Sequence, residues 1–396
     1  MGFLKLLMIT GDRSLAQGKK GAFYNTLEEF HKYWERVDII CPKAQSAKRS
    51  PRRSLRRSAG KAQNHNSKLK IFDNVYIHES PWLLIFHPFW ILRQGLRIIQ
   101  DTRYEIQDTI MTVHDYPPFY NGLGAWLLWR KTRIPYVLEI MHIPGHPKTA
   151  GFKEIFYKWL MRVFARYSAK RAGAVRVINQ KQTPEFLIKS GVPKEKIRYI
   201  PAFYIDLETF RPMPEVKKDY DLVFAARLER NKGILNLIEV VKIVKQSKPD
   251  IKLLVIGSGS ELDRIKLNAK RYTLNANIFF SGWLPTLEDV ARAYNSARVF
   301  INPSLNEGGP RVVLEAMACG LPVITTRVGL MLDIIKNGDN GLFTDWNPHG
   351  IADRILHLLY SENLQKKFSS AGLELVKQFE KKAAIKNYAE KLKNLA

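Results

Sequence analysis

Two glutamates eight residues apart bracket a glycine pair and a proline in the segment EGGPRVVLE, which runs from Glu307 to Glu315. Proline favours the first turn of a helix, because its φ is already helical and it has no N–H to leave unpaired. The segment therefore predicts a helix that begins near Pro310. The start of a helix binds phosphate through its unpaired N–H groups and the positive end of its dipole. The amides expected to point outward here belong to Arg311, Val312 and Val313.

The two carboxylates would lie on either side of that phosphate site. Glu307 stands on the loop with Gly308 and Gly309, and Glu315 lies roughly 7 Å further along the helix axis. An ionised carboxylate only accepts hydrogen bonds, so it suits hydroxyl groups. A nucleotide sugar presents sugar hydroxyls, a diphosphate and ribose hydroxyls in that order. The alternative is a solvated amphipathic helix, but glycine, proline and acid all fall where the ligand would need them.

The same segment, continued by AMACGLPVITTRVG, resembles the donor-site motif of the family 4 retaining glycosyltransferases, which have the GT-B fold. Two further blocks match at the family's spacing. Residues 225–233, AARLERNKG, resemble its GRLxxxKG block, and residues 255–259, VIGSG, resemble its GxG at a strand end. The resemblance is strong over residues 221–342 and weaker toward the N-terminus. It implies an α/β protein of GT-B type, with two Rossmann-like doubly wound domains facing each other across a cleft.

Two basic residues in the second block have a role by resemblance. Arg227 and Lys232 would bind the donor diphosphate and stabilise it as it leaves. Arginine offers a fork of donors matched to phosphate oxygens, and lysine adds a mobile point charge. Simple surface solvation is the alternative, and it fits Arg227 less well because this residue directly follows an apolar strand.

The remaining donor-side residues are glycines and a tryptophan. Gly257 and Gly259 would permit close approach of the backbone to the nucleotide, although both could be ordinary turn glycines. The loop with Gly282 and Trp283 matches the place where the family's nucleobase sits.

On the N-terminal side, two histidines follow predicted strands, at the edge of a sheet where ligands bind. His142 occupies the place of a family histidine near the reacting sugar, whereas a structural role is the alternative for it and the favoured one for His114. The loop from Gly18 to Gly21 resembles the family's glycine loop at the cleft. Its sequence, GKKG, departs from the usual adjacent glycines, which leaves its role open.

Short apolar strands alternate with helical stretches along the whole chain, a pattern typical of parallel βαβ units. The expected strands are residues 5–10, 37–41, 110–114, 136–141, 174–178, 221–226, 252–256, 278–281, 299–301 and 322–325. At 396 residues the chain is long enough for two domains. We expect an acceptor-side domain over 1–206 and a nucleotide-sugar domain over 207–378. By resemblance, a closing helix over 379–396 returns to the first domain.

The charge is unusual: 63 lysines and arginines against 37 acidic residues give a net charge of +26. Residues 43–70 contain ten basic residues and no acidic one, and they predict a mobile loop. A nucleic-acid site would favour stacking aromatics, which this segment lacks, so no nucleic acid is expected. An anionic membrane surface fits better, at about 1 kcal/mol per basic residue near the lipid. A merely solvated run remains the alternative.

Residues 81–100 follow this loop and contain Trp82, Trp90 and a run of apolar residues. The run is too short to cross a bilayer, which needs about 20 residues. It predicts either a helix lying at the membrane interface or an ordinary buried crossover helix. Cys41 and Cys319 each lie in apolar runs, which indicates buried thiols and a reducing, cytoplasmic setting. With the basic loop and the interfacial segment, we expect a peripheral protein on the inner face of the cytoplasmic membrane.

No cluster of metal ligands is visible in the sequence, and the Asp219-Tyr220-Asp221 triplet precedes a strand, where a chance match is the better explanation. We therefore expect neither metal nor other cofactor, and we expect cationic groups and a helix terminus to neutralise the leaving diphosphate. No carboxylate nucleophile is evident beyond Glu307, whose expected task is to hold sugar hydroxyls.

Together these features predict a retaining, metal-independent glycosyltransferase. It would move a sugar from a UDP- or GDP-sugar to a lipid-linked saccharide acceptor in bacterial surface polysaccharide synthesis. A glycosyltransferase with a soluble acceptor and a GT-B phosphorylase or epimerase are the related alternatives. A non-catalytic basic module that binds membrane or nucleic acid would explain the charge, but it would leave the acidic pair without a purpose.

Overall fold

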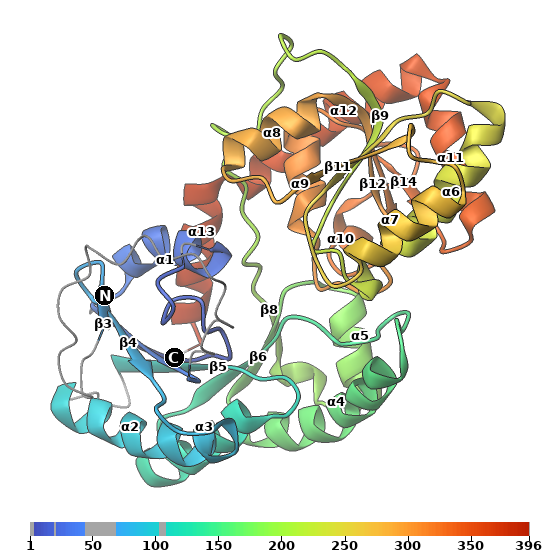
Figure 1. Ribbon diagram of the computed structural model, residues 1–396. Helices are drawn as coiled ribbons and strands as arrows, with labels where there is room; N and C mark the ends of the chain where they lie inside the picture. Colours follow the sequence, from blue (N-terminus) through green and yellow to red (C-terminus); the bar gives the residue numbers. More distant parts are fainter. Residues whose placement is uncertain (1–3, 20, 44–68, 103–107, 396) are drawn as a thin grey trace, which may run out of the picture.

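Two largely parallel β-sheets, each covered by helices on both faces, organise the chain into two lobes (Figure 1). The computed structural model describes residues 4–19, 21–43, 69–102 and 108–395. Strands such as KLLMI and LLVI are apolar without alternation, because a strand inside a parallel sheet is buried on both faces. This architecture confirms the predicted α/β fold with two Rossmann-like domains.

The N-terminal sheet has the order β3-β4-β2-β1-β5-β6-β7-β8, and only β3 runs antiparallel to its neighbour among the described strands. Its strands are β1 (Lys5–Ile9), β2 (Arg36–Cys41), β3 (Leu69–Ile71), β4 (Val75–Glu79), β5 (Thr109–His114), β6 (Tyr136–Ile140), β7 (Ala174–Val177) and β8 (Ile197–Tyr199). Its helices are α1 (Ala22–Phe30), α2 (His87–Thr102), α3 (Tyr120–Thr132), α4 (Phe152–Arg171) and α5 (Gln182–Lys189).

The C-terminal sheet is wholly parallel, in the order β11-β10-β9-β12-β13-β14. Its strands are β9 (Tyr220–Ala225), β10 (Leu253–Ile256), β11 (Ile278–Gly282), β12 (Ala297–Asn302), β13 (Val323–Thr326) and β14 (Leu342–Thr344). The accompanying helices are α6 (Ile234–Ser247), α7 (Leu262–Arg271), α8 (Leu287–Asn295), α9 (Arg311–Ala318), α10 (Met331–Ile334), α11 (Pro348–Leu359) and α12 (Glu362–Val376). The last helix, α13 (Lys381–Lys393), packs against the N-terminal lobe. The strand order reverses between β9 and β12, and ligands bind at the carboxyl ends of strands at such a point.

Every strand expected from the sequence is present, and four short strands were missed. β3 and β8 have three residues each, β14 has three, and β4 alternates polar and apolar residues. The loop expected over 43–70 is wrong at its end, because Leu69–Ile71 pairs with β4 and forms an edge strand. Residues 44–68 lie outside the described residues.

The chain crosses between the lobes twice at adjacent places. Ile205 N–H donates to the Phe379 carbonyl at 2.7 Å, and α13 then runs back beside α1 (Figure 1). Tyr388 of α13 stacks on Phe30 with ring centroids 4.5 Å apart. The last helix is therefore part of the N-terminal hydrophobic core.

A buried charge also holds α13 in place. Arg176, fully buried on β7, donates from Nη1 to the Glu139 carboxylate and to the Tyr388 hydroxyl, the latter at 2.8 Å. Its guanidinium carbon lies 4.0 Å from the centroid of the Tyr388 ring. An uncompensated buried charge would be costly, so this network couples the position of α13 to the N-terminal sheet.

Candidate functional site

The start of α9 lies where the strand order of the C-terminal sheet reverses. Pro310 is the N-cap of α9, with φ −72° and ψ 98°, so the helix begins one residue later than the proline. One detail of the sequence prediction is wrong. Val313 N–H already donates to the Pro310 carbonyl at 3.1 Å, because the first turn is tight, and only the amides of Arg311 and Val312 remain candidates for a phosphate.

Lys232 and Glu307, which are 75 residues apart in sequence, form an ion pair at the carboxyl ends of β9 and β12. Both side chains are largely buried. Ser304 Oγ also lies 3.4 Å from the same Glu307 oxygen, Oε1. Two residues predicted for the donor diphosphate and the donor sugar therefore occupy one small volume.

His142 lies beside this pair. Burial lowers the pKa of His142 to about 4, against the opposing effect of Glu307, so its imidazole is neutral near pH 7. Its Nδ1 is buried and has no hydrogen-bond partner among the described residues. A buried ring nitrogen without a partner next to a carboxylate is a group that a bound substrate could satisfy.

The glycines after Glu307 explain how the two domains meet there. A Cβ on Gly308 would lie 2.0 Å from the Met141 carbonyl oxygen, and one on Gly309 would lie 2.1 Å from the Phe203 ring. Asn179 Nδ2 also donates to the Gly308 carbonyl at 3.1 Å. The missing side chains thus let the Glu307 loop touch the strand end that carries His142.

Glu315, on the first turns of α9, is half-buried beside α8. Tyr294 donates from its hydroxyl to Glu315 Oε2 at 3.2 Å. Burial raises the pKa of Glu315, and the Arg311 guanidinium opposes this rise. The Tyr294 bond occupies Oε2 and leaves Glu315 Oε1 for another donor.

Arg227 is exposed on the loop after β9, next to the GxG loop after β10. A Cβ on Gly257, which has φ +123°, would lie 2.0 Å from the Ala226 carbonyl oxygen, and one on Gly259 would lie 2.4 Å from that of Leu228. Both glycines are therefore required by backbone packing between the two loops, whatever they do for a nucleotide.

The loop predicted to hold the base lies next to the same GxG. Gly257 N–H donates to the Gly282 carbonyl at 2.8 Å, and Trp283 is 74% exposed. Gly282 has φ +70°, a conformation that favours glycine.

On the N-terminal side, the predicted residues lie at the carboxyl ends of β1 and β5. Burial lowers the pKa of His114, whose ring lies 5.4 Å from that of Tyr116. Gly18 takes φ +68° in the loop after β1, and Gly21 is the N-cap of α1. None of these three residues contacts His142, Lys232 or Glu307 in the described structure, so their part in a site stays a prediction.

Sequence reasoning missed Gln182, at the start of α5. Its side chain donates to the carbonyls of Glu307 at 3.3 Å and His146 at 3.1 Å, and it accepts from Gly329 N–H at 2.9 Å. It thereby ties three segments around the Glu307 loop. A lone glutamine on a helix carries no pattern that would have revealed this.

A polar cavity of about 390 Å³ lies between the domains, beside the loop over 225–233. The sequence did not predict this cavity. Residues from both sides line it, among them Gly151, Glu154, Glu229, Arg230 and Ser260. In the part of the chain that the structure covers, no group of three or more histidine, cysteine, aspartate or glutamate residues could hold a metal ion.

The segment over 81–100 contains a buried crossover helix, and its contact with a membrane interface stays a prediction. Ile91 and Ile98 of α2 are buried in the core, as in a crossover helix, whereas Leu83, Ile85 and Phe89 are exposed at its start. None of the described helices combines the length and the apolar character needed to cross a membrane.

Comparisons with known proteins agree with this geometry. The family model of the group 1 glycosyl transferases matches residues 207–375. The chain is 30% identical over 335 residues to the capsular polysaccharide biosynthesis glycosyltransferase CapM of Staphylococcus aureus, covering 78% of this chain and 82% of CapM. It is 30% identical over 247 residues to the glycosyltransferase MJ1069 of Methanocaldococcus jannaschii, where the match spans 61% of this chain and only 60% of that protein.

A solved structure supports the fold. HepE from Anabaena, in complex with UDP and glucose, superposes with a TM-score of 0.71 over 99% of this chain and all of that one, at 17% identity. Together with the identity to CapM over most of its length, these findings show that the chain belongs to the group 1 glycosyltransferases.

Proposed function

We propose that this protein transfers a sugar from a nucleoside-diphosphate sugar to a saccharide acceptor carried on a lipid, in the assembly of a surface polysaccharide. One observation carries the donor part. The start of α9 lies between Glu307 and Glu315, with Lys232 paired to Glu307 at the same strand edge. Carboxylates for hydroxyls thus flank cations and amides for a diphosphate, in the order in which a nucleotide sugar presents these groups.

The donor would lie along this edge with its nucleoside toward Glu315 and its sugar toward Glu307 and His142. Trp283, exposed beside Gly257, would lie next to the base. Arg227, Lys232 and the first amides of α9 would bind the diphosphate and stabilise the charge that develops on it as it leaves. We propose that these groups make a metal ion unnecessary.

We further propose that the anomeric configuration is retained, as in the family 4 enzymes that the motifs resemble. The bond between the anomeric carbon and the phosphate oxygen breaks, and a new bond to the acceptor hydroxyl oxygen forms on the same face. The acceptor proton passes to the departing phosphate oxygen. Neutral His142 would accept a hydrogen bond from, or donate one to, a hydroxyl of the donor sugar through its unpartnered nitrogen.

The acceptor proposal rests on different observations. CapM, a relative over most of its length, is named for capsular polysaccharide biosynthesis. The net charge of +26 and the exposed apolar residues at the start of α2 favour an enzyme that works against an anionic membrane. We place it on the cytoplasmic face of that membrane, where nucleotide sugars are made.

Thermal-shift titration with UDP, GDP, ADP and CMP tests the donor site. A ligand at a hundred times its dissociation constant adds about 2.7 kcal/mol of stability. We expect one diphosphate to stabilise the wild type and to stabilise Glu315→Ala far less. No response to any nucleotide would refute the donor site. Release of that diphosphate from its sugar, measured with lipid-linked and with soluble saccharides, then identifies the acceptor class.

A further inference from the structure

Helix α4 turns large apolar side chains away from the protein core. Phe152 is 90% exposed and Trp159 57%, and the same outer face carries Phe156, Val163 and Tyr167 at intervals of three or four residues. The opposite face packs into the core through Met161, Ala165 and Ala169. A surface helix ordinarily carries polar residues opposite its buried stripe, so this helix has an outer face without a partner in the described chain.

Positive charge flanks that outer face. α4 has six basic residues and a single acidic one, Glu154. The basic residues are Lys153, Lys158, Arg162, Arg166, Lys170 and Arg171. The Glu154 carboxylate faces inward, where it accepts from Asn306 Nδ2 at 3.0 Å and from Ala150 N–H at 2.6 Å. An apolar face with aromatic residues and basic flanks is typical of helices that lie in a membrane interface.

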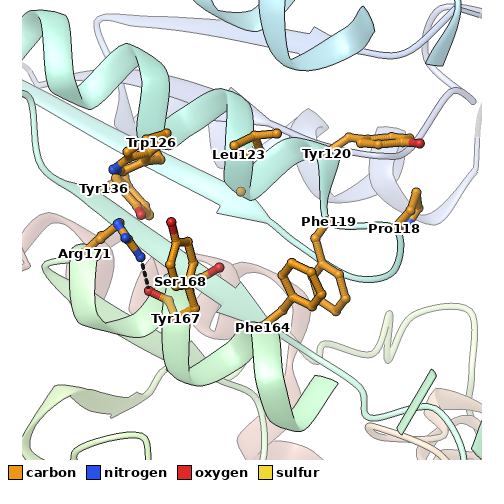
Figure 2. Close-up of a pocket in the computed structure, with 11 residues that line it drawn as sticks. Pro118, Phe119, Tyr120, Leu123, Trp126, Tyr136, Phe164, Tyr167, Ser168 and Arg171 are labelled. Atoms are coloured by element: carbon orange, nitrogen blue, oxygen red, sulfur yellow. Dashed lines mark hydrogen bonds between the residues drawn. The ribbon is translucent and has the colours of Figure 1, made fainter. Parts of the chain in front are cut away.

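An apolar pocket opens between α3 and α4 (Figure 2). It has a volume of about 130 Å³. At one end Phe119 stacks on Phe164, with ring centroids 4.5 Å apart. At the other end the Arg171 guanidinium carbon lies 3.4 Å from the centroid of Tyr167 and 5.4 Å from that of Trp126. The pocket is thus lined by aromatic rings and has a cation at one end.

The pocket and the outer face of α4 share Tyr167, which is half exposed, so the two form one surface. We propose that α4 lies on an anionic bilayer, with part of one phospholipid hydrocarbon chain in this pocket and the lipid phosphate beside Arg171. A second copy of the chain, at net charge +26, would be repelled by the basic flanks, whereas an anionic headgroup is attracted. The inference rests on the proposed function only in that the acceptor would be carried by the same membrane.

Quenching of tryptophan fluorescence locates the contact. The wild type is mixed with vesicles of phosphatidylcholine and phosphatidylglycerol whose acyl chains are brominated. We expect quenching, and we expect its amplitude to fall in Trp159→Phe and in Trp126→Phe. Trp283→Phe, which removes an exposed tryptophan of the other domain, is the matched control and should leave the quenching unchanged. No quenching of the wild type, or a loss in Trp82→Phe alone, would overturn the proposal.

Vesicle flotation tests the energetics of the same contact. Phe156→Ser combined with Trp159→Ser should weaken binding to anionic vesicles at least about tenfold, because two large apolar side chains are lost from the interface. Leu267→Ser, at a 65% exposed leucine on α7, should bind as the wild type does. Equal binding by the double variant would overturn the proposal. Nucleotide binding is measured in parallel: a wild type that binds vesicles and no nucleotide would uphold this inference while the donor site fails.

Discussion

Replacing Glu315 by glutamine tests the ribose role of this residue with little disturbance of the fold. The wild-type carboxylate is half-buried and accepts from the Tyr294 hydroxyl at 3.2 Å. Glutamine has nearly the same shape and keeps an oxygen for Tyr294. Since partial burial disfavours the charged form of Glu315 and the variant removes that charge, its stability without ligand should equal or exceed that of the wild type near neutral pH.

Donor affinity should fall despite this stability. A hydrogen bond to a charged acceptor contributes about 1.5–3 kcal/mol, and one to a neutral acceptor about 0.5–1.5 kcal/mol. The loss is then about 1–1.5 kcal/mol for each ribose hydroxyl, or about 2–3 kcal/mol for two. Because about 1.4 kcal/mol corresponds to a factor of ten, the dissociation constant should rise about 30- to 140-fold.

The pH dependence gives a second, independent readout. Burial raises the pKa of Glu315 above its ordinary value of 4.5, so the unliganded native state binds this proton more tightly than the unfolded chain does. Any stability contributed by the protonated form is present at low pH and is lost as the pH rises through the raised pKa. Ribose hydroxyls prefer the ionised form, so the ratio of wild-type to Glu315→Gln donor affinity should increase over the same pH range. The titration of the diphosphate itself affects both proteins alike and cancels in this ratio.

Isothermal titration calorimetry with the preferred nucleoside diphosphate, from about pH 5 to 8, measures both effects. Glu288→Gln, at an exposed acid in the first turn of α8, is the matched control and should bind as the wild type does. An unchanged dissociation constant in Glu315→Gln would refute the ribose role. A ratio of wild-type to Glu315→Gln affinity that falls as the pH rises would refute the sign of the argument.

Three further results are expected. Arg227→Ala should lower kcat about 100-fold while weakening donor binding much less, as measured by steady-state kinetics and calorimetry; equal losses would indicate uniform binding. Arg176→Met should lower the free energy of unfolding in urea by about 3–5 kcal/mol and Tyr388→Phe by about 1–3 kcal/mol, because only the first change leaves the buried Glu139 carboxylate without its cation. A larger loss in Tyr388→Phe would contradict the hydrogen-bond network around Arg176. Lys232→Met and Glu307→Gln should each abolish most sugar transfer. In urea unfolding, the double variant should lose less free energy of unfolding than the two single variants lose together, because either single change already breaks the ion pair. Strictly additive losses would mean that the ion pair contributes nothing.

The positions of the loops proposed to hold the donor could be predicted, because the residues concerned lie close together in sequence. Glu307, Pro310 and Glu315 fall within nine residues, and a helix start fixes their relative positions. The alternation of strands and helices then places every such loop at the carboxyl edge of a sheet. What spacing could not give is the meeting of Lys232 with Glu307, since that depends on β9 and β12 being neighbours at the reversal of strand order.

The apolar face of α4 could not be predicted for a different reason. Its sequence has apolar residues on all sides of the helix, so periodicity does not say which side is buried. Only the packing of Met161 and Ala165 against the sheet shows that Phe152 and Trp159 face outward. The contacts of Gln182 could not be predicted either, because its three partners come from segments up to 147 residues away in sequence.

The Lys232–Glu307 pair has a consequence for how the site works. In the unliganded protein the ammonium and the carboxylate neutralise each other in a largely buried place. A donor would bring a diphosphate that attracts Lys232 and hydroxyl groups that donate to Glu307, so both ends of the pair find a new partner within one ligand. A free nucleoside diphosphate offers only the first of these. On the proposed placement of the donor, binding of the whole nucleotide sugar would leave Glu307 compensated by hydroxyl donors. After transfer the sugar would be gone and the pair could re-form, which would favour release of the spent diphosphate.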